Sequence, residues 1–137
     1  MDYTRSSELL TSVQEEISRV AARSYTPEGL SLYDSIRATS RDDDTLNRMI
    51  SDVLDTILAR FRDFISSISD AAIVFNLPDL PAGFGSKISS ELDRAITMGV
   101  VASWLEEKGI QESQSYANRF NAAMDKAELL MVTRKIE

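Results

Sequence analysis

The sequence predicts an all-α fold, an antiparallel helical bundle of four main helices. Apolar residues recur at spacings of three and four along most of its 137 residues, which is typical of the buried face of amphipathic helices. All three prolines lie in two short segments, 26–29 and 78–85, where helices are expected to end. The stretch DAAIVFNLPDLPAGFG, residues 70–85, departs from helical spacing. We therefore expect one domain, 1–137, with a strand-containing loop at 70–86 between the second and third helices.

The first helix is expected over residues 4–24. Its apolar residues form one stripe and its charged residues occupy the opposite face, as on a surface helix of a bundle. Pro27 and Gly29 end it, because proline lacks the backbone donor and glycine favours a turn. The connector over residues 30–36 fits either a short helix or a packed irregular segment.

Three consecutive aspartates, Asp42 to Asp44, precede the second helix. They can cap a helix and complement the positive end of its dipole. Clustered carboxylates also bind calcium or magnesium, but consecutive side chains point in different directions and no EF-hand spacing follows, so capping is favoured. The apolar face continues from Leu46 to Ile68 and predicts a helix of about 25 residues, roughly 37 Å long.

Two more helices are expected over residues 87–108 and 113–135. The first is apolar over more than half its circumference, which predicts a position in the middle of the bundle or against another subunit. Gly99 lies in its interior at a cost of up to about 1 kcal/mol relative to alanine, and we interpret it as a close helix crossing. Gly109, followed by Ile110, predicts a helix stop with the apolar residue folding back.

The composition argues against several functional classes. The chain has no cysteine and no histidine, which excludes disulfides and thiolate sites and removes the usual general base. The carboxylates and serines show no catalytic spacing, so we expect no enzymatic activity, no metal and no cofactor. No apolar stretch approaches about 20 residues, and the N-terminus lacks the pattern of a secretory signal, so no membrane association is expected.

The charge balance bears on nucleic-acid binding. With 15 basic and 22 acidic residues the net charge is −7, which argues against nonspecific binding of nucleic acid through bulk charge. A local basic patch stays compatible with this balance. Arg60 and Arg62 flank Phe61 on the expected second helix, where surface positions are favoured over a phosphate contact.

The apolar run from Ala71 to Phe75 predicts one short strand whose partner is not evident. Unpaired backbone groups are costly to bury, so three arrangements are open. The segment is an extended loop that plugs the bundle, or it pairs within the chain with 84–86 or 26–32, or it pairs with another subunit. The candidate residues for a subunit or portal interface are Ile73, Val74, Phe75, Leu77, Leu80 and Phe84.

The order of these signals carries a family resemblance over roughly residues 42–135. An acidic cap leads into DDDTLNRMISDVLDTILARF, a loop with a strand and prolines follows, and ELDRAITMGVVASWLEEKG precedes a last helix that ends in RK. With Ala95, Ile96 and Trp104 near the end of the penultimate helix, this resembles the head–tail connector (adaptor) proteins of tailed bacteriophages. The N-terminal helix and connector are longer than the simplest members need, which leaves a related neck or virion-assembly protein open.

The resemblance implies a structural virion protein that forms a homo-oligomeric ring between portal and tail. Its partners would be other copies of the chain and portal, tail or neck proteins, and DNA would be only passing cargo in the channel. It would lie in the virion neck after assembly in the bacterial host cytoplasm. The alternative is a small helical protein-binding or regulatory module without enzymatic activity.

Overall fold

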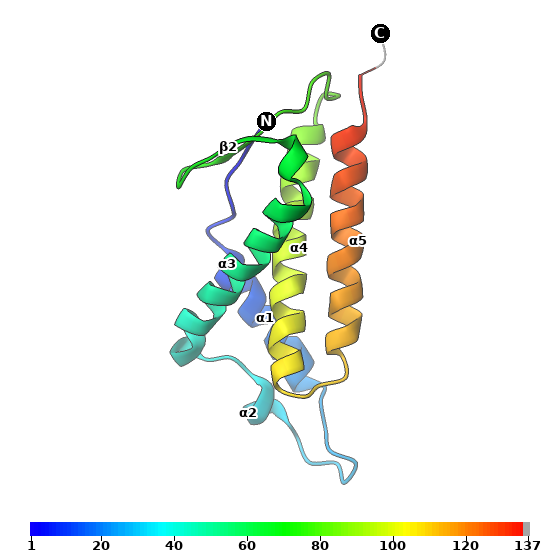
Figure 1. The fold of residues 1–137 in the computed structure, drawn as a ribbon. Helices are drawn as coiled ribbons and strands as arrows, with labels where there is room; N and C mark the ends of the chain where they lie inside the picture. The colour runs from blue at the N-terminus through cyan, green and yellow to red at the C-terminus, as the bar shows by residue number, and fades with distance from the viewer. Residues whose placement is uncertain (136–137) are drawn as a thin grey trace.

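Four long helices make up most of residues 1–135, the part of the chain that the computed structural model describes (Figure 1). They are α1 (Leu9–Ala22), α3 (Asp43–Arg60), α4 (Phe84–Glu107) and α5 (Ser113–Val132), and α2 (Tyr33–Ile36) is a single turn. The predicted helical class is confirmed. α4 packs against the three other long helices, and α4 and α5 lie side by side in opposite directions (Figure 1).

The centre of α4 is buried over most of its circumference, as its wide apolar face predicted, although Arg94 is exposed. Gly99 is the point of closest approach: a Cβ atom there would lie 2.9 Å from Val53 Cγ1 of α3 and 3.0 Å from Phe120 Cδ1 of α5. The predicted close crossing at Gly99 is therefore confirmed. Helix α4 ends as predicted at Gly109, with a φ of 70°, and the Ile110 N–H donates to the Leu105 carbonyl at 2.9 Å.

The connector after α1 is held against α4 by one buried hydrogen bond. Trp104 Nε1 donates to the Ile36 carbonyl at 2.7 Å, and both side chains lie in the core. Of the two arrangements open for residues 30–36, the short helix is correct, since Tyr33–Ile36 forms the single turn α2. Trp104 therefore fixes α2 to the central helix.

The second helix is shorter than its apolar spacing predicted. It ends at Arg60, a 3₁₀ turn covers Arg62–Phe64, and Ile65–Ile68 forms strand β2. The spacing of Phe61, Phe64, Ile65 and Ile68 suits a helix, but the two isoleucines also suit a strand. Residues 65–68 form a strand because they pair with β3 (Ile73–Phe75). The prediction of a continuous helix to Ile68 is wrong for this reason.

The central strand has partners on both sides. A three-stranded antiparallel sheet has the order β1 (Asp2–Tyr3), β3 (Ile73–Phe75), β2 (Ile65–Ile68), with a bulge between Ile65 and Ser67. Of the three arrangements open at the level of sequence, pairing within the chain is the one observed. The two partner segments named there are wrong, because 84–86 begins α4 and 26–32 folds back on itself through a bridge between Tyr25 and Ser31.

The first residues complete this sheet instead of extending α1. The Met1 ammonium donates to the Phe75 carbonyl at 3.0 Å, and the Phe75 N–H donates to the Met1 carbonyl at 2.7 Å. The prediction that the first helix begins at Thr4 is therefore wrong, since α1 begins at Leu9. A two-residue strand carries no periodicity, so only its distant partner defines it.

Candidate functional site

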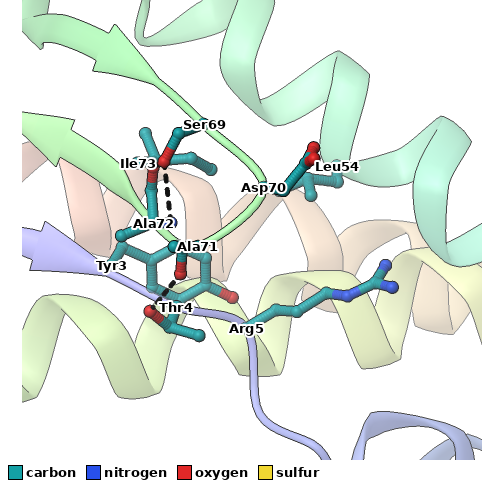
Figure 2. Close-up of a pocket in the computed structure, with 9 residues that line it drawn as sticks. All are labelled: Tyr3, Thr4, Arg5, Leu54, Ser69, Asp70, Ala71, Ala72 and Ile73. Atoms are coloured by element: carbon teal, nitrogen blue, oxygen red, sulfur yellow. Dashed lines mark hydrogen bonds between the residues drawn. The ribbon is translucent and has the colours of Figure 1, made fainter.

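A small hollow lies beside the turn between β2 and β3 (Figure 2). It has a volume of about 240 Å³ and is formed by the N-terminal segment, the turn and one side chain of α3. The residues that line it are Tyr3, Thr4, Arg5, Leu54, Ser69, Asp70, Ala71, Ala72 and Ile73. The sequence showed no sign of it, because its walls come from segments about seventy residues apart.

The hydroxyl groups of Tyr3, Thr4 and Ser69 in this hollow form hydrogen bonds that hold the fold. The Tyr3 hydroxyl donates to Asp93 Oδ1 of α4 at 2.6 Å. Thr4 Oγ1 donates to the Ala71 carbonyl at 3.0 Å (Figure 2). The Ser69 hydroxyl closes the turn by bonding to both backbone groups of Ala72. These bonds join the N-terminal segment to the sheet and to the central helix.

The pKa of Tyr3, at the wall of the hollow, is perturbed by its surroundings. Burial, and then the hydrogen bond to Asp93, raise the pKa of its hydroxyl well above the ordinary value of 10.0. The hydroxyl therefore stays protonated at neutral pH and acts as a donor. The protonated hydroxyl is unsuited to serve as a general base. We interpret the contacts around the hollow as structural, because they hold the N-terminal segment against the sheet and α4.

The capping interpretation of the aspartates at the start of α3 holds only in part, because Asp42 occupies the N-cap position of α3 but its side chain caps the preceding 3₁₀ turn and not α3 itself. The Asp42 carboxylate accepts the Thr39 N–H at 2.8 Å in a capping box over the preceding 3₁₀ turn, and Asp43 accepts from Gln14 Nε2 at 2.7 Å. Asp43 and Asp44 lie in the first turn of α3, where negative charge is favourable. Within residues 1–135, no group of three or more carboxylates is placed to hold a metal ion.

Arg60 and Arg62 have different surroundings. Arg60 Nη2 donates to carboxylate oxygens of Asp125 and Glu128 of α5, each at 2.8 Å. These two hydrogen bonds raise the pKa of the Arg60 guanidinium, and the bond to Asp125 has the larger effect. Arg60 thereby joins the end of α3 to α5. Arg62 is exposed beside the outer strand β2, where it lines a shallow hollow with Leu58.

The six residues predicted for an interface fall into two groups. Ile73, Phe75 and Leu77 are buried in the core of their own chain, with 7%, 2% and 9% exposure. Their side chains therefore pack within the monomer, and a role for them at an interface stays a prediction. Val74, Leu80 and Phe84 are partly exposed, and their role at an interface stays a prediction.

Within residues 1–135, the large apolar side chains that are exposed belong to segments near the two ends of the molecule. One end is the loop before α2, and the other is formed by the sheet and the last turns of α5 (Figure 1). We call the first set the loop end, which consists of Tyr25, Leu30 and Tyr33. We call the second set the sheet end, which consists of Ile68, Leu129 and Val132.

Sequence reasoning missed both sets, although an available signal pointed to the loop end. Tyr25 and Leu30 flank the Thr26–Gly29 turn, and apolar residues beside a tight turn have little neighbouring chain to cover them. Leu129 and Val132 belong to a helix whose other large apolar residues are buried or partly buried, so periodicity alone did not separate them.

Comparisons with protein-family models, curated protein sequences and solved structures found no match to this chain. Function is therefore inferred from the geometry of the chain itself. None of the helices in residues 1–135 combines the length and apolar character needed to cross a bilayer.

Proposed function

We propose that the chain is a structural subunit that assembles into a ring, as the head–tail connector of a tailed bacteriophage between portal and tail. The observation that carries the proposal is that segments at opposite ends of the fold carry exposed apolar side chains: the loop before α2 and the start of α2 at one end, and strand β2 and the last turns of α5 at the other. Exposed apolar patches mark surfaces that bind other proteins. A subunit placed between two different layers needs one such surface for each.

Backbone hydrogen bonds hold the loop end in one conformation before any partner binds. Thr26 donates its N–H to the Leu30 carbonyl at 2.8 Å, and the Leu30 N–H returns to Thr26 Oγ1 at 3.0 Å. The Leu32 N–H donates to the Ser24 carbonyl at 2.9 Å, which closes the base of the loop. A loop held in one conformation loses less entropy on binding, so its exposed Tyr25 and Leu30 can contribute more to affinity.

The sheet end is held by the C-terminal segment. The Lys135 N–H donates to the Asp79 carbonyl at 2.5 Å, which ties the chain after α5 to the loop before α4. A mostly apolar hollow lies between these segments, with Leu80 and Pro81 on one side and Thr133 on the other. Leu80, a predicted interface residue, thus lies at this end.

The distance between the two ends suits a layer in a larger assembly. Helix α5 has 20 residues, so its ends are separated by about 30 Å at 1.5 Å per residue. In the proposal the four long helices act as one antiparallel bundle that keeps the ends apart. Copies that meet through unlike surfaces close into a ring when the rotation between them closes. DNA would pass through that ring, and no membrane is involved.

The second candidate function is a small helical module that binds a regulatory partner. The loop end alone would suffice for it, since three exposed apolar side chains on a preorganised loop form a small docking surface. Such a module would need no ring and no second apolar end.

The mass of the protein in solution separates the two candidates. Light scattering coupled to size exclusion is measured over a concentration series, with the protein alone and with purified portal. A discrete species of many 15.3 kDa subunits in either series would support the connector. A monomer or dimer in both series, at every concentration, would refute the ring and favour the module.

A further inference from the structure

A basic groove runs along the seam between α4 and α5, although the chain carries a net charge of −7. Two adjoining surface hollows share Glu91 and Lys126 and together form this groove. Its small side chains, Ser90 and Ala122 among them, keep the groove open. Four basic side chains line this basic groove: Lys87, Arg94, Arg119 and Lys126.

Three of these four cations have no acidic partner within the described part of the chain. Lys126 Nζ lies 3.0 Å from Glu91 Oε1, whereas Lys87, Arg94 and Arg119 form no ion pair among residues 1–135. All four are exposed. The groove thus carries an excess of about three positive charges, counted from four cations and Glu91.

An acidic stripe occupies the outward face of α3. It consists of Asp44, Asp52 and Asp55, which are exposed and form no ion pair within residues 1–135. Arg48 is the basic residue on the same face, so the stripe keeps two negative charges. From Asp44 to Asp55 it extends over 11 residues, or about 17 Å along the helix.

The groove has nearly the same length as the stripe. Glu91 of α4 lies level with Lys126 of α5, and Gly99 lies level with Phe120. Arg119 of α5 therefore lies about level with Gly99 of α4. Gly99 lies 12 residues after Lys87 in α4, so the groove from Lys87 to Arg119 is about 18 Å long.

The two charged surfaces face away from each other, so they cannot neutralise each other within one chain. Gly99 marks the face of α4 that meets Val53 of α3. Arg94 lies five residues earlier, which turns it about 140° around the helix and away from α3. The stripe lies on the side of α3 opposite its buried residues.

We propose that the basic groove of one copy binds the acidic stripe of the next copy. The inference rests on the proposed ring, and it names the surfaces through which neighbouring subunits meet. Opposite signs, similar lengths and positions on opposite sides make the contact heterologous, and repetition of such a contact builds a closed ring. Because the charged groups are exposed, the contact weakens as salt rises.

Charge reversal tests this contact in the full chain. The groove variant carries Arg94→Glu and Arg119→Glu, the stripe variant carries Asp52→Lys and Asp55→Lys, and a combined variant carries all four changes. The control is Arg41→Glu with Arg62→Glu, because both arginines are exposed, unpaired in the described residues and outside the groove. Urea unfolding establishes that each variant is folded, and light scattering then measures association, with portal present if the wild type requires it.

We expect the groove and stripe variants each to associate roughly tenfold more weakly than the wild type, or worse. The combined variant regains association, because both signs are exchanged, and the control behaves as the wild type. Wild-type association falls between about 50 mM and 500 mM salt.

Three results would overturn the proposal, and they separate it from the proposed function. A wild-type ring that is indifferent to both reversals would place the contact elsewhere and leave the connector standing. A wild type that never assembles, with or without portal, would refute both. Duplex DNA that binds the wild type but not the groove variant, while assembly is unchanged, would assign the groove to nucleic acid.

Discussion

Replacing Phe75 with alanine tests whether the central strand is held inside its own chain. Phe75 is 2% exposed and lies in β3, between β1 and β2. Its backbone exchanges two hydrogen bonds with Met1, which the substitution leaves available. The change therefore removes the buried ring and spares the strand pairing.

The expected loss is large compared with the stability of a domain of this size. Truncating a buried phenylalanine to alanine costs about 3–5 kcal/mol, through lost burial and the cavity left behind. Typical domains are stable by about 5–15 kcal/mol, so the free energy of unfolding falls by about a fifth or more. With a urea slope of about 2 kcal/mol per molar, the midpoint falls by about 1.5–2.5 M.

Urea unfolding followed by the fluorescence of Trp104, the single tryptophan, measures this loss. Far-ultraviolet circular dichroism provides a second probe of the same transition. The matched control is Val74→Ala, since Val74 is the neighbouring strand residue and is only partly buried. That control should cost about 1 kcal/mol or less.

One result would refute the assignment of Phe75 to the chain's own core. If Phe75→Ala unfolds at the wild-type midpoint while the assembled species is lost, its ring packs between subunits. An equal loss for Phe75→Ala and Val74→Ala would likewise contradict the burial difference on which the estimate depends.

Three further outcomes follow from individual contacts. Gly99→Ala should lower the melting temperature measured by calorimetry. The added methyl group overpacks the helix crossing at a cost of about 1–3 kcal/mol, which exceeds the roughly 1 kcal/mol gained in helix propensity. A higher melting temperature would contradict the close crossing. Trp104→Phe should cost about 1–3 kcal/mol in urea unfolding, because the buried Ile36 carbonyl loses its donor; an unchanged midpoint would contradict that role. Because the pKa of Tyr3 is raised in the folded chain, its contribution to stability is complete below the unfolded value near 10 and declines as pH rises above it. Tyr3→Phe should therefore flatten the fall in melting temperature above about pH 10, and an equally steep fall would argue against this role.

The sequence by itself determined the helices and their boundaries where breakers are present. Apolar spacing and proline placement depend on neighbours within one or two turns, so they located α4 and α5 closely. Gly99 and Gly109 were also interpreted correctly, because a glycine inside or just after a helix has few structural roles.

Only the tertiary structure decided what the segment from Ile65 to Phe75 does. Isoleucines at 65 and 68 satisfy a helical period and a strand equally well, and the hydrogen bonds that choose between them come from residues far away in the chain. The Met1 ammonium, 74 residues from Phe75, completes the sheet. The candidate surfaces arise in the same way, since the basic groove joins Lys87 and Lys126 only when two helices align. Local spacing sets which elements form, whereas packing between distant segments sets which side chains are left exposed, and those exposed side chains are the ones that can bind a partner.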